Sequence, residues 1–157
     1  MLDEVLERLP EAPARPGARE LVEGVVATGK RVALVSNSSH QVIDVTLASF
    51  PWAELLETRI SVDDVSRGKP HPDIYEYAAG RLSLRPEQCL VIEDSVAGAT
   101  AAVGSGARCI AVTFGLVPER FDGVTDRVAD SLAEVAELLL LNPGRVFSRE
   151  EILERIW

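Results

Sequence analysis

The feature that most constrains this chain is a run of four apolar residues, 89–92, that leads directly into two adjacent carboxylates, Glu93 and Asp94. Ser95, a good helix N-cap, and the mostly small residues 97–105 follow. This order predicts a buried parallel strand, a short turn and a helix. Open α/β sheets bind ligands at the carboxyl ends of their strands, so both carboxylates are expected at such a site. Two carboxylates there suit Mg²⁺, which prefers oxygen ligands; an acidic first helical turn is the alternative.

Helical and strand-like segments alternate along the rest of the chain, which predicts an α/β fold with a parallel sheet and helices on both faces. Helices are expected at residues 2–9, 17–28, 39–50, 73–82, 97–105 and 131–141. Strands are expected at residues 31–35, 57–62, 89–92 and 108–112, with a short fifth strand at 127–129. At 157 residues, the chain has the length of one domain with its own core.

Composition narrows the partners that this chain can have. A net charge of −9 argues against nucleic acid binding by the surface as a whole. No apolar run approaches the length of a membrane span, and neither a membrane partner nor a signal peptide is expected. Cys89 and Cys109 lie in strand-like apolar runs and are interpreted as unpaired core residues. Unpaired cysteines are typical of proteins in a reducing compartment, so a cytoplasmic protein is predicted.

A cluster of hydroxyl and amide side chains, Ser36-Asn37-Ser38-Ser39, follows the expected strand 31–35 and precedes a helix. Backbone N–H groups, side-chain donors and the helix dipole at such a position favour an anion such as phosphate. Serine and asparagine are also common helix caps and turn residues, and that interpretation is equally open from these residues alone.

Lys69 stands out because the chain otherwise uses arginine. Of its 16 basic residues, only Lys30 and Lys69 are lysines. A compact ammonium between Gly68 and Pro70 could pair with a phosphate and a carboxylate at once, whereas the simpler alternative is a solvated surface lysine. His71 is interpreted as a turn residue rather than a metal ligand.

Taken together, these motifs resemble the haloacid dehalogenase superfamily, and most of all its capped subfamily of β-phosphoglucomutases and phosphoglycolate phosphatases. The resemblance covers about residues 14–137. Its motifs are Leu-Val-Ser-Asn-Ser-Ser at 34–39, Gly-Lys-Pro-His-Pro-Asp-Ile-Tyr at 68–75, Cys-Leu-Val-Ile-Glu-Asp-Ser-Val-Ala-Gly at 89–98 and Ala-Ala-Val-Gly-Ser-Gly-Ala at 101–107.

The resemblance implies a three-layer, Rossmann-like fold and an Mg²⁺-dependent phosphatase or phosphomutase that acts on a small phosphorylated metabolite through an aspartyl-phosphate. Ser36 would bind the transferring phosphoryl group, with the Asn37 backbone beside it. Lys69 would neutralise charge on the nucleophile and the phosphoryl oxygens. Asp94, with help from Glu93, would hold Mg²⁺.

The chain also departs from the family pattern, which begins with a strand that ends in Asp-x-Asp-Gly and supplies the nucleophile. Asp3 has no strand-like run before it, and Asp63 and Asp64 are adjacent rather than spaced by one residue. Most of the cap domain has no counterpart either. The chain therefore resembles the carboxyl-terminal two-thirds of such an enzyme. A non-catalytic fragment or pseudo-enzyme that binds phosphate or a partner is the alternative function.

The ends of the chain are expected to differ from the core at 17–137. Residues 1–16 are interpreted as a cap remnant and linker. Residues 138–157 resemble the first helices of a response-regulator winged-helix domain, with a capping box at Ser148 and Glu151; a plain helical hairpin is the alternative.

The absent first strand has a structural consequence. In the family it lies between the strands that correspond here to 31–35 and 89–92. Unpaired backbone groups in a core are costly, so either these two strands pair directly, or a segment of a second copy fills the slot, or the chain alone folds poorly. We expect direct pairing, with aggregation or dimerisation in solution.

Overall fold

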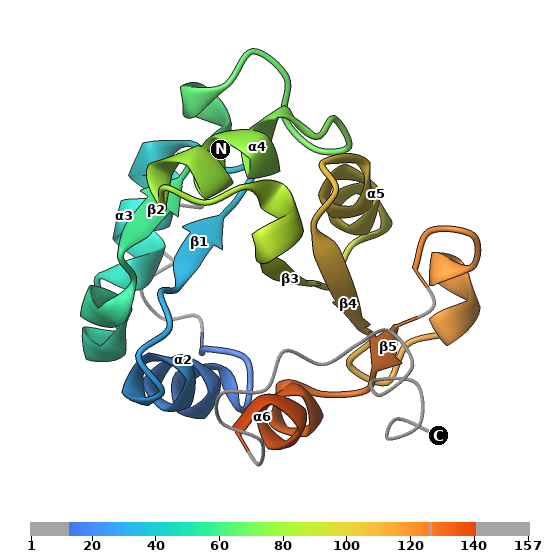
Figure 1. Ribbon diagram of the computed structural model, residues 1–157. Coiled ribbons are helices and arrows are strands. Elements are labelled where there is room, and N and C mark those ends of the chain that lie inside the picture. The colour runs from blue at the N-terminus through green and yellow to red at the C-terminus, as the bar shows by residue number, and fades with distance from the viewer. Residues whose placement is uncertain (1–12, 126, 141–157) are drawn as a thin grey trace, which may run out of the picture.

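The structure is a computed structural model that describes residues 13–125 and 127–140 (Figure 1). In this part of the chain, helices and strands alternate as the sequence predicts. The strands are β1 (Ala33–Val35), β2 (Thr58–Ile60), β3 (Leu90–Glu93), β4 (Arg108–Val112) and β5 (Val128–Ala129). The α-helices are α2 (Ala18–Ala27), α3 (His40–Leu47), α4 (Asp73–Arg81), α5 (Val96–Gly104) and α6 (Leu132–Leu140).

Short 3₁₀ helices that the periodicity did not predict connect several of these elements. They are η2 (Pro51–Leu55), η3 (Val62–Asp64), η4 (Pro86–Gln88) and η5 (Pro118–Phe121). Three of them begin at a proline, whose fixed φ suits the first helical position. The expected helix at 2–9 and the Ser148–Glu151 capping box lie outside the described residues. None of the described helices has the length and hydropathy to cross a membrane.

All strand pairs are parallel, which confirms the α/β class, but the strands form two sheets rather than one. β1 pairs with β2, and β3, β4 and β5 form a second sheet in that order. The expected direct pairing of the strands at 31–35 and 89–92 is therefore wrong. Within the described residues, β1 and β3 each have a neighbouring strand on one edge only.

Helices cover both faces of the strands, as Figure 1 shows, with α4 and α5 on one side and α2 and α6 on the other. Alternation along β4 explains the two layers. Cys109 and Ala111 belong to an apolar cluster with α4 and α5, whereas Ile110 and Val112 belong to a cluster with α2 and α6. A third small cluster packs α3 against η2.

Helix α4 packs against both sheets. It contacts β1, β2 and α5, and its buried residues Ile74 and Tyr75 share one cluster with Ile60 of β2 and Ala111 of β4. The two sheets are therefore joined through side-chain packing on this helix.

Capping residues place the helices that follow β1 and β3. The Ser39 side chain accepts a hydrogen bond from the N–H of Val42, and the Ser95 side chain accepts one from Gly98. Each serine satisfies an amide that the first helical turn leaves without a partner. Both helices consequently begin immediately after the polar motifs that end the strands.

Candidate active site

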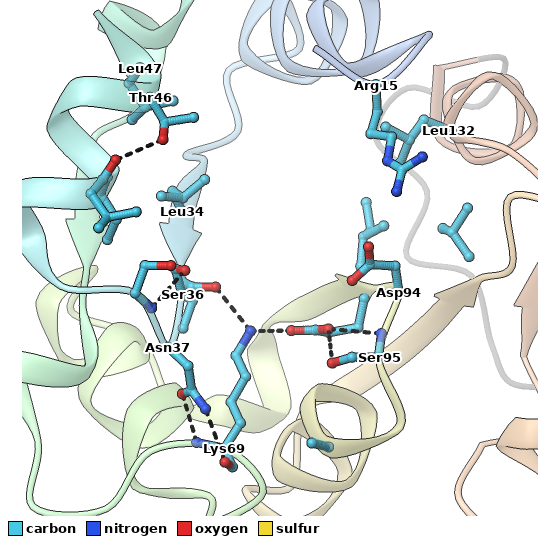
Figure 2. A pocket seen from close by; sticks show the side chains of 18 of the residues that line it. Arg15, Leu34, Ser36, Asn37, Thr46, Leu47, Lys69, Asp94, Ser95 and Leu132 are labelled. Atoms are coloured by element: carbon cyan, nitrogen blue, oxygen red, sulfur yellow. Dashed lines mark hydrogen bonds and ion pairs between the residues drawn. The ribbon is translucent and has the colours of Figure 1, made fainter. Parts of the chain in front are cut away.

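A cavity of about 490 Å³ lies between β1 and β3, at the carboxyl ends of the strands (Figure 2). Its walls include the residues that the sequence singled out from three separate loops, which are Ser36, Asn37, Lys69, Glu93 and Asp94. The structure thus confirms that these residues converge. The turn with His71 lies outside the lining of this cavity.

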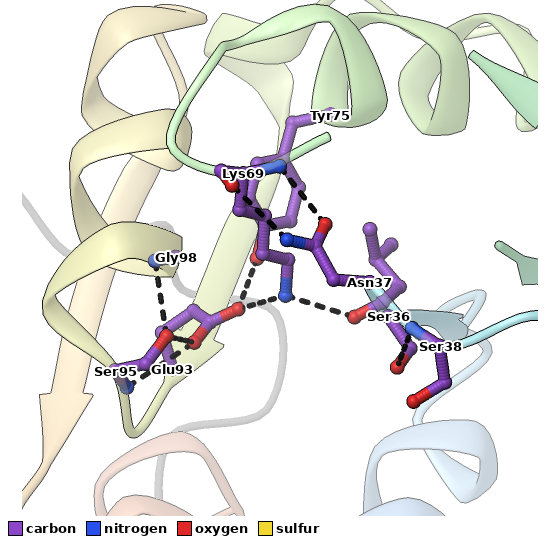
Figure 3. A network of polar contacts seen from close by, with 9 residues as sticks. Ser36, Asn37, Ser38, Lys69, Tyr75, Glu93, Ser95 and Gly98 are labelled. Atoms are coloured by element: carbon purple, nitrogen blue, oxygen red, sulfur yellow. Dashed lines mark hydrogen bonds and ion pairs between the residues drawn. The ribbon is translucent and has the colours of Figure 1, made fainter. Parts of the chain in front are cut away.

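Lys69 connects the ends of the two sheets. Its Nζ donates a hydrogen bond to the Val35 carbonyl oxygen at 3.0 Å and forms an ion pair with Glu93 Oε1 (Figure 3). The Lys69 and Glu93 side chains are only 10% and 6% exposed. Lys69 is therefore a buried, positioned charge and not the solvated surface lysine that was the alternative.

Glu93 is held by donors on both carboxylate oxygens. Tyr75 donates its hydroxyl to Oε1 at 2.5 Å, and Ser95 donates its hydroxyl and its N–H to Oε2 at 3.0 and 3.3 Å. Burial alone would raise the pKa of Glu93, but the charge of Lys69 and the hydrogen bonds from Lys69, Tyr75 and Ser95 outweigh it and lower the pKa below its ordinary value. The carboxylate is thereby kept ionised.

Gly98, in the first turn of α5, makes room for this carboxylate. A Cβ atom at this position would overlap the Glu93 carboxyl group. The glycine at the end of the Ser-Val-Ala-Gly motif is thus required for steric reasons, which the sequence pattern did not reveal.

Tyr75 is a site residue that sequence reasoning missed. Its ring is buried in the core, and burial, followed by the nearby charge of Glu93, raises the pKa of its hydroxyl well above the ordinary range. It therefore stays protonated and serves as a donor. Tyr75 ends the motif at 68–75, but no role for its side chain was inferred from the sequence.

Asn37 fixes the position of Lys69 through the backbone. Its side-chain Oδ1 accepts from the Lys69 N–H at 2.9 Å, and its Nδ2 donates to the Lys69 carbonyl oxygen at 3.0 Å. Gly68 allows this close approach, because a Cβ there would lie 2.7 Å from Asn37 Oδ1. The amide side chain of the first motif and the glycine of the second thus join their two loops.

The loop after β1 has the geometry of an anion site. The Ser36 hydroxyl accepts from the Ser38 N–H at 3.1 Å, which holds the loop in a tight turn before α3. Among the described residues, no acceptor contacts the backbone N–H of Asn37. A free N–H at the approach to a helix N-terminus favours a bound anion.

Asp94 differs from its neighbour Glu93 in its surroundings. It is exposed at the wall of the cavity, and in the described part of the chain it forms no hydrogen bond or ion pair (Figure 2). Its oxygens are therefore available to a ligand. No group of three or more metal-ligating side chains occurs among the described residues, so the two carboxylates would form an incomplete metal site.

Arg15 is a second residue that sequence reasoning missed. It lines the cavity together with Phe114 and Leu132, and its guanidinium carbon lies 4.6 Å from the centre of the Phe114 ring. In Figure 2 it lies across the cavity from Lys69. It precedes α2 in a proline-rich segment, where no motif pointed to a site.

Residues 1–106 match the family model described as haloacid dehalogenase-like hydrolase. The chain belongs to this family. A bifunctional riboflavin kinase/FMN phosphatase from Arabidopsis thaliana is 40% identical over 123 residues, which cover 76% of this chain and 32% of that protein.

Solved structures of the family agree with the fold. CbbY from Rhodobacter sphaeroides, in complex with phosphate, has a TM-score of 0.73 and 32% identity, covering 83% of this chain and 60% of that chain. A hydrolase of the family from Deinococcus radiodurans, with bound phosphate and sodium, has a TM-score of 0.74 and 33% identity over the same shares. This chain thus spans about 60% of the length of these solved relatives.

Proposed function

We propose that this chain forms the phosphate-binding and metal-binding half of a phosphatase site that acts on a small phosphorylated metabolite. One observation supports this most: the Lys69 ammonium is fixed between the Val35 carbonyl and Glu93, at the cavity that Ser36 and Asp94 also line. Two relatives are consistent with it, since one is named an FMN phosphatase and CbbY was solved with phosphate.

The residues on the β1 side would hold the phosphoryl group. The Ser36 hydroxyl and the Asn37 N–H are donors at the cavity wall, and the N-terminus of α3 lies behind them. Lys69 gives two of its three ammonium hydrogens to Val35 and Glu93, and the third can bind a phosphoryl oxygen. Phosphoryl transfer needs this positioning and charge neutralisation above all.

Asp94 would be the main ligand for Mg²⁺ in this proposal, with Glu93 next to it. Mg²⁺ keeps several waters and uses one or two carboxylates together with substrate phosphate, so the donors present fit part of its coordination shell. A bound Mg²⁺ would supply further neutralisation of phosphoryl charge. Glu93, whose oxygens accept from Lys69, Tyr75 and Ser95, would mainly hold Lys69 in place.

The covalent step of the proposed reaction needs an aspartate nucleophile. One carboxylate oxygen would bond to phosphorus as the ester oxygen leaves, and water would then release phosphate from the aspartyl-phosphate. None of the aspartates in the 157 residues has a second aspartate two positions later. We therefore expect phosphate binding without turnover from this chain alone, and the same fact favours a non-catalytic, phosphate-binding role as the second candidate.

Calorimetric titration of the chain with inorganic phosphate, with and without Mg²⁺, tests the proposal. We expect binding that Mg²⁺ strengthens and that Lys69→Met abolishes. Lys30→Met is the matched control, because this lysine is exposed between α2 and β1 and does not line the cavity. Circular dichroism checks that each variant is folded. If folded Lys69→Met bound phosphate as well as Lys30→Met does, the proposed phosphate site would be refuted.

Turnover of p-nitrophenyl phosphate with Mg²⁺ is the second measurement. No turnover above background is expected from the chain alone. Turnover that disappears in both Lys69→Met and Asp94→Asn would show that the chain contains a nucleophile after all and would favour a complete phosphatase.

A further inference from the structure

The loop 36–39, which would hold the phosphoryl group, is attached to the segment that follows β2. The Ser36 N–H donates to the Ile60 carbonyl oxygen at 2.9 Å. The Ser61 hydroxyl, which is fully buried, donates to the Ser38 carbonyl oxygen at 2.7 Å. The position of the loop therefore depends on the segment that begins at Ser61.

The short helix η3 also contacts His40, the first residue of the helix α3 that follows this loop. The His40 N–H donates to Asp63 Oδ2, and the His40 ring Nε2 contacts Asp64 Oδ1, both at 3.0 Å. Asp64 is held in turn by the Ser61 N–H, which donates to its Oδ2 at 2.8 Å. The adjacent carboxylates of η3, for which no role was inferred from the sequence, thus hold the start of α3 by its backbone and by a side chain.

His40 is the group in this contact whose charge changes near neutral pH. Its hydrogen bond to Asp64, together with the charges of Asp64, Asp63 and Asp44, raises the pKa of the imidazole above its ordinary value of 6.5. The Ser61 N–H and the His40 ring lower the pKa of Asp64, so this carboxylate stays ionised. Protonated His40 and Asp64 therefore form an ion pair, with side chains that are 45% and 22% exposed.

The charged groups around His40 in the described part of the chain include more carboxylates than arginines. They are Asp44 of α3, Arg59 of β2, Asp63 and Asp64 of η3, and Arg81 of α4. A proton on His40 offsets one of these negative charges, next to a loop that would bind an anion. Loss of the proton removes this compensation and replaces a charge-assisted hydrogen bond with a weaker one.

We propose that His40 is a positioning residue that makes anion binding by the loop 36–39 depend on pH. With its proton, His40 pairs with Asp64, holds the start of α3 against η3 and offsets negative charge beside the loop. Without its proton, the contact weakens and the loop binds a dianion less tightly. The affinity therefore falls as the pH rises through the pKa of His40, which lies above 6.5. The effect on anion binding rests on the proposed function, whereas the contact itself does not.

Nuclear magnetic resonance of the imidazole groups tests the contact in the full chain. The chain has two histidines, so His71→Gln identifies the signals of His40. We expect the midpoint of the His40 titration to lie above pH 6.5 and to fall in Asp64→Asn, whose neutral amide still accepts hydrogen bonds. Circular dichroism checks that each variant is folded. A midpoint that Asp64→Asn leaves unchanged would overturn the contact.

The same spectra show whether the loop responds to His40. The Ser38 N–H donates to the Ser36 hydroxyl at 3.1 Å and therefore reports the conformation of the loop (Figure 3). We expect its amide signal to shift with the same midpoint as the His40 ring. This shift should be absent from His40→Gln and present in His71→Gln. A Ser38 signal that ignores the His40 titration would overturn the positioning role.

Calorimetric titration with sulfate tests the effect on anion binding. Sulfate keeps its charge between about pH 5.5 and 8.5, whereas phosphate gains and loses a proton in this range. We expect the wild-type chain to bind sulfate about threefold less tightly at the higher pH, which is the size of effect that one exposed charge pair produces. His40→Gln, which cannot gain a proton, should bind sulfate equally at both pH values. His71→Gln is the matched control and should keep the dependence, because His71 is exposed and does not line the cavity.

The titration and the binding measurement are linked by thermodynamics. An anion that binds more tightly to protonated His40 must favour that proton by the same factor. For a threefold effect, saturating sulfate should raise the midpoint of the His40 titration by about 0.5 pH unit. A midpoint that bound sulfate leaves unchanged would overturn the coupling.

Three further results would overturn the role of His40 in anion binding. They are wild-type sulfate binding that does not change with pH, a pH dependence that persists in His40→Gln, and a pH dependence that disappears in His71→Gln. If the wild-type chain bound sulfate at neither pH, the proposed function would fail together with the effect on anion affinity. The signals of His40 and Ser38 would then still support or overturn the contact and its effect on the loop.

Discussion

Lys69 and Glu93 form an ion pair that joins the end of one sheet to the end of the other, with both side chains largely withdrawn from water. A buried pair of this kind contributes less to stability than its attraction suggests, because both charges lose their hydration. Removing one partner alone is costly, since the other charge stays buried. The pair thus ties the geometry of the candidate site to the stability of the fold.

Lys69→Met is expected to lower the free energy of unfolding by about 3–5 kcal/mol, because Glu93 is left buried without its cation. The double variant Lys69→Met/Glu93→Gln should recover most of this loss, since a neutral amide needs no counter-ion. Urea unfolding measures both, with Lys30→Met as the control. A double variant no more stable than Lys69→Met would show that uncompensated charge is not the cause.

Acid should destabilise the wild-type chain partly through Glu93. Its pKa in the folded state lies below the ordinary value of 4.5, so the unfolded state binds this proton more tightly. The stabilisation is complete above the unfolded pKa and is lost as the pH falls through the folded pKa. We expect Lys69→Met/Glu93→Gln to lose less stability than wild type below about pH 4.5. The free energy of unfolding of both proteins is measured at several pH values. A parallel decrease of the two free energies as the pH falls would contradict this prediction.

Gly98→Ala should destabilise the fold, because the added methyl group would overlap the Glu93 carboxyl group. Gly80→Ala is the matched control within α4, where a Cβ would meet no atom within 4 Å. There, replacing a helical glycine should add about 0.5–1 kcal/mol of stability. Thermal unfolding of the two variants should therefore shift in opposite directions. Similar shifts would refute the steric role of Gly98.

Asn37→Ala should loosen the loop that positions Lys69, because it removes both hydrogen bonds to the Lys69 backbone. We expect faster hydrogen exchange at the Lys69 N–H, together with a stability loss of about 1 kcal/mol. Ser38→Ala is the control, since the Ser38 side chain makes no hydrogen bond to the described residues. An unchanged rate of hydrogen exchange at the Lys69 N–H in Asn37→Ala would show that the Asn37 side chain does not hold the Lys69 backbone in place.

Much of the fold could be predicted from local patterns. Apolar runs between polar turns located each strand, and Ser39 and Ser95 located two helix starts, because capping depends on neighbours in sequence. The three motif loops were expected together because carboxyl ends of parallel strands share one edge of a sheet. The contribution of Tyr75 was harder to predict, because its hydroxyl donates a hydrogen bond to Glu93, which lies 18 residues away in the sequence.

The separation of β1 from β3 could not be predicted by the rule that unpaired strand edges close. That rule considers backbone hydrogen bonds alone. In the structure, Lys69 lies between the two strand ends and pairs with both sides, and α4 packs against both sheets. Bringing the strands together would displace a buried ion pair. Side-chain interactions between segments distant in the sequence thus determine the distance between β1 and β3. Local sequence patterns do not reveal such interactions.

The attachment of both sheets to α4 has a consequence for how the molecule opens. No backbone ladder joins β1 to β3 in the described part of the chain, so cooperative unfolding of the two halves depends on side chains such as Ile74 and Tyr75. A sheet with continuous hydrogen bonds transmits stability along its whole width, whereas side-chain packing on α4 and α2 transmits less. The half with β1, β2 and α3 can therefore open at a lower free energy than the half with β4, as a separate unit of native-state fluctuation.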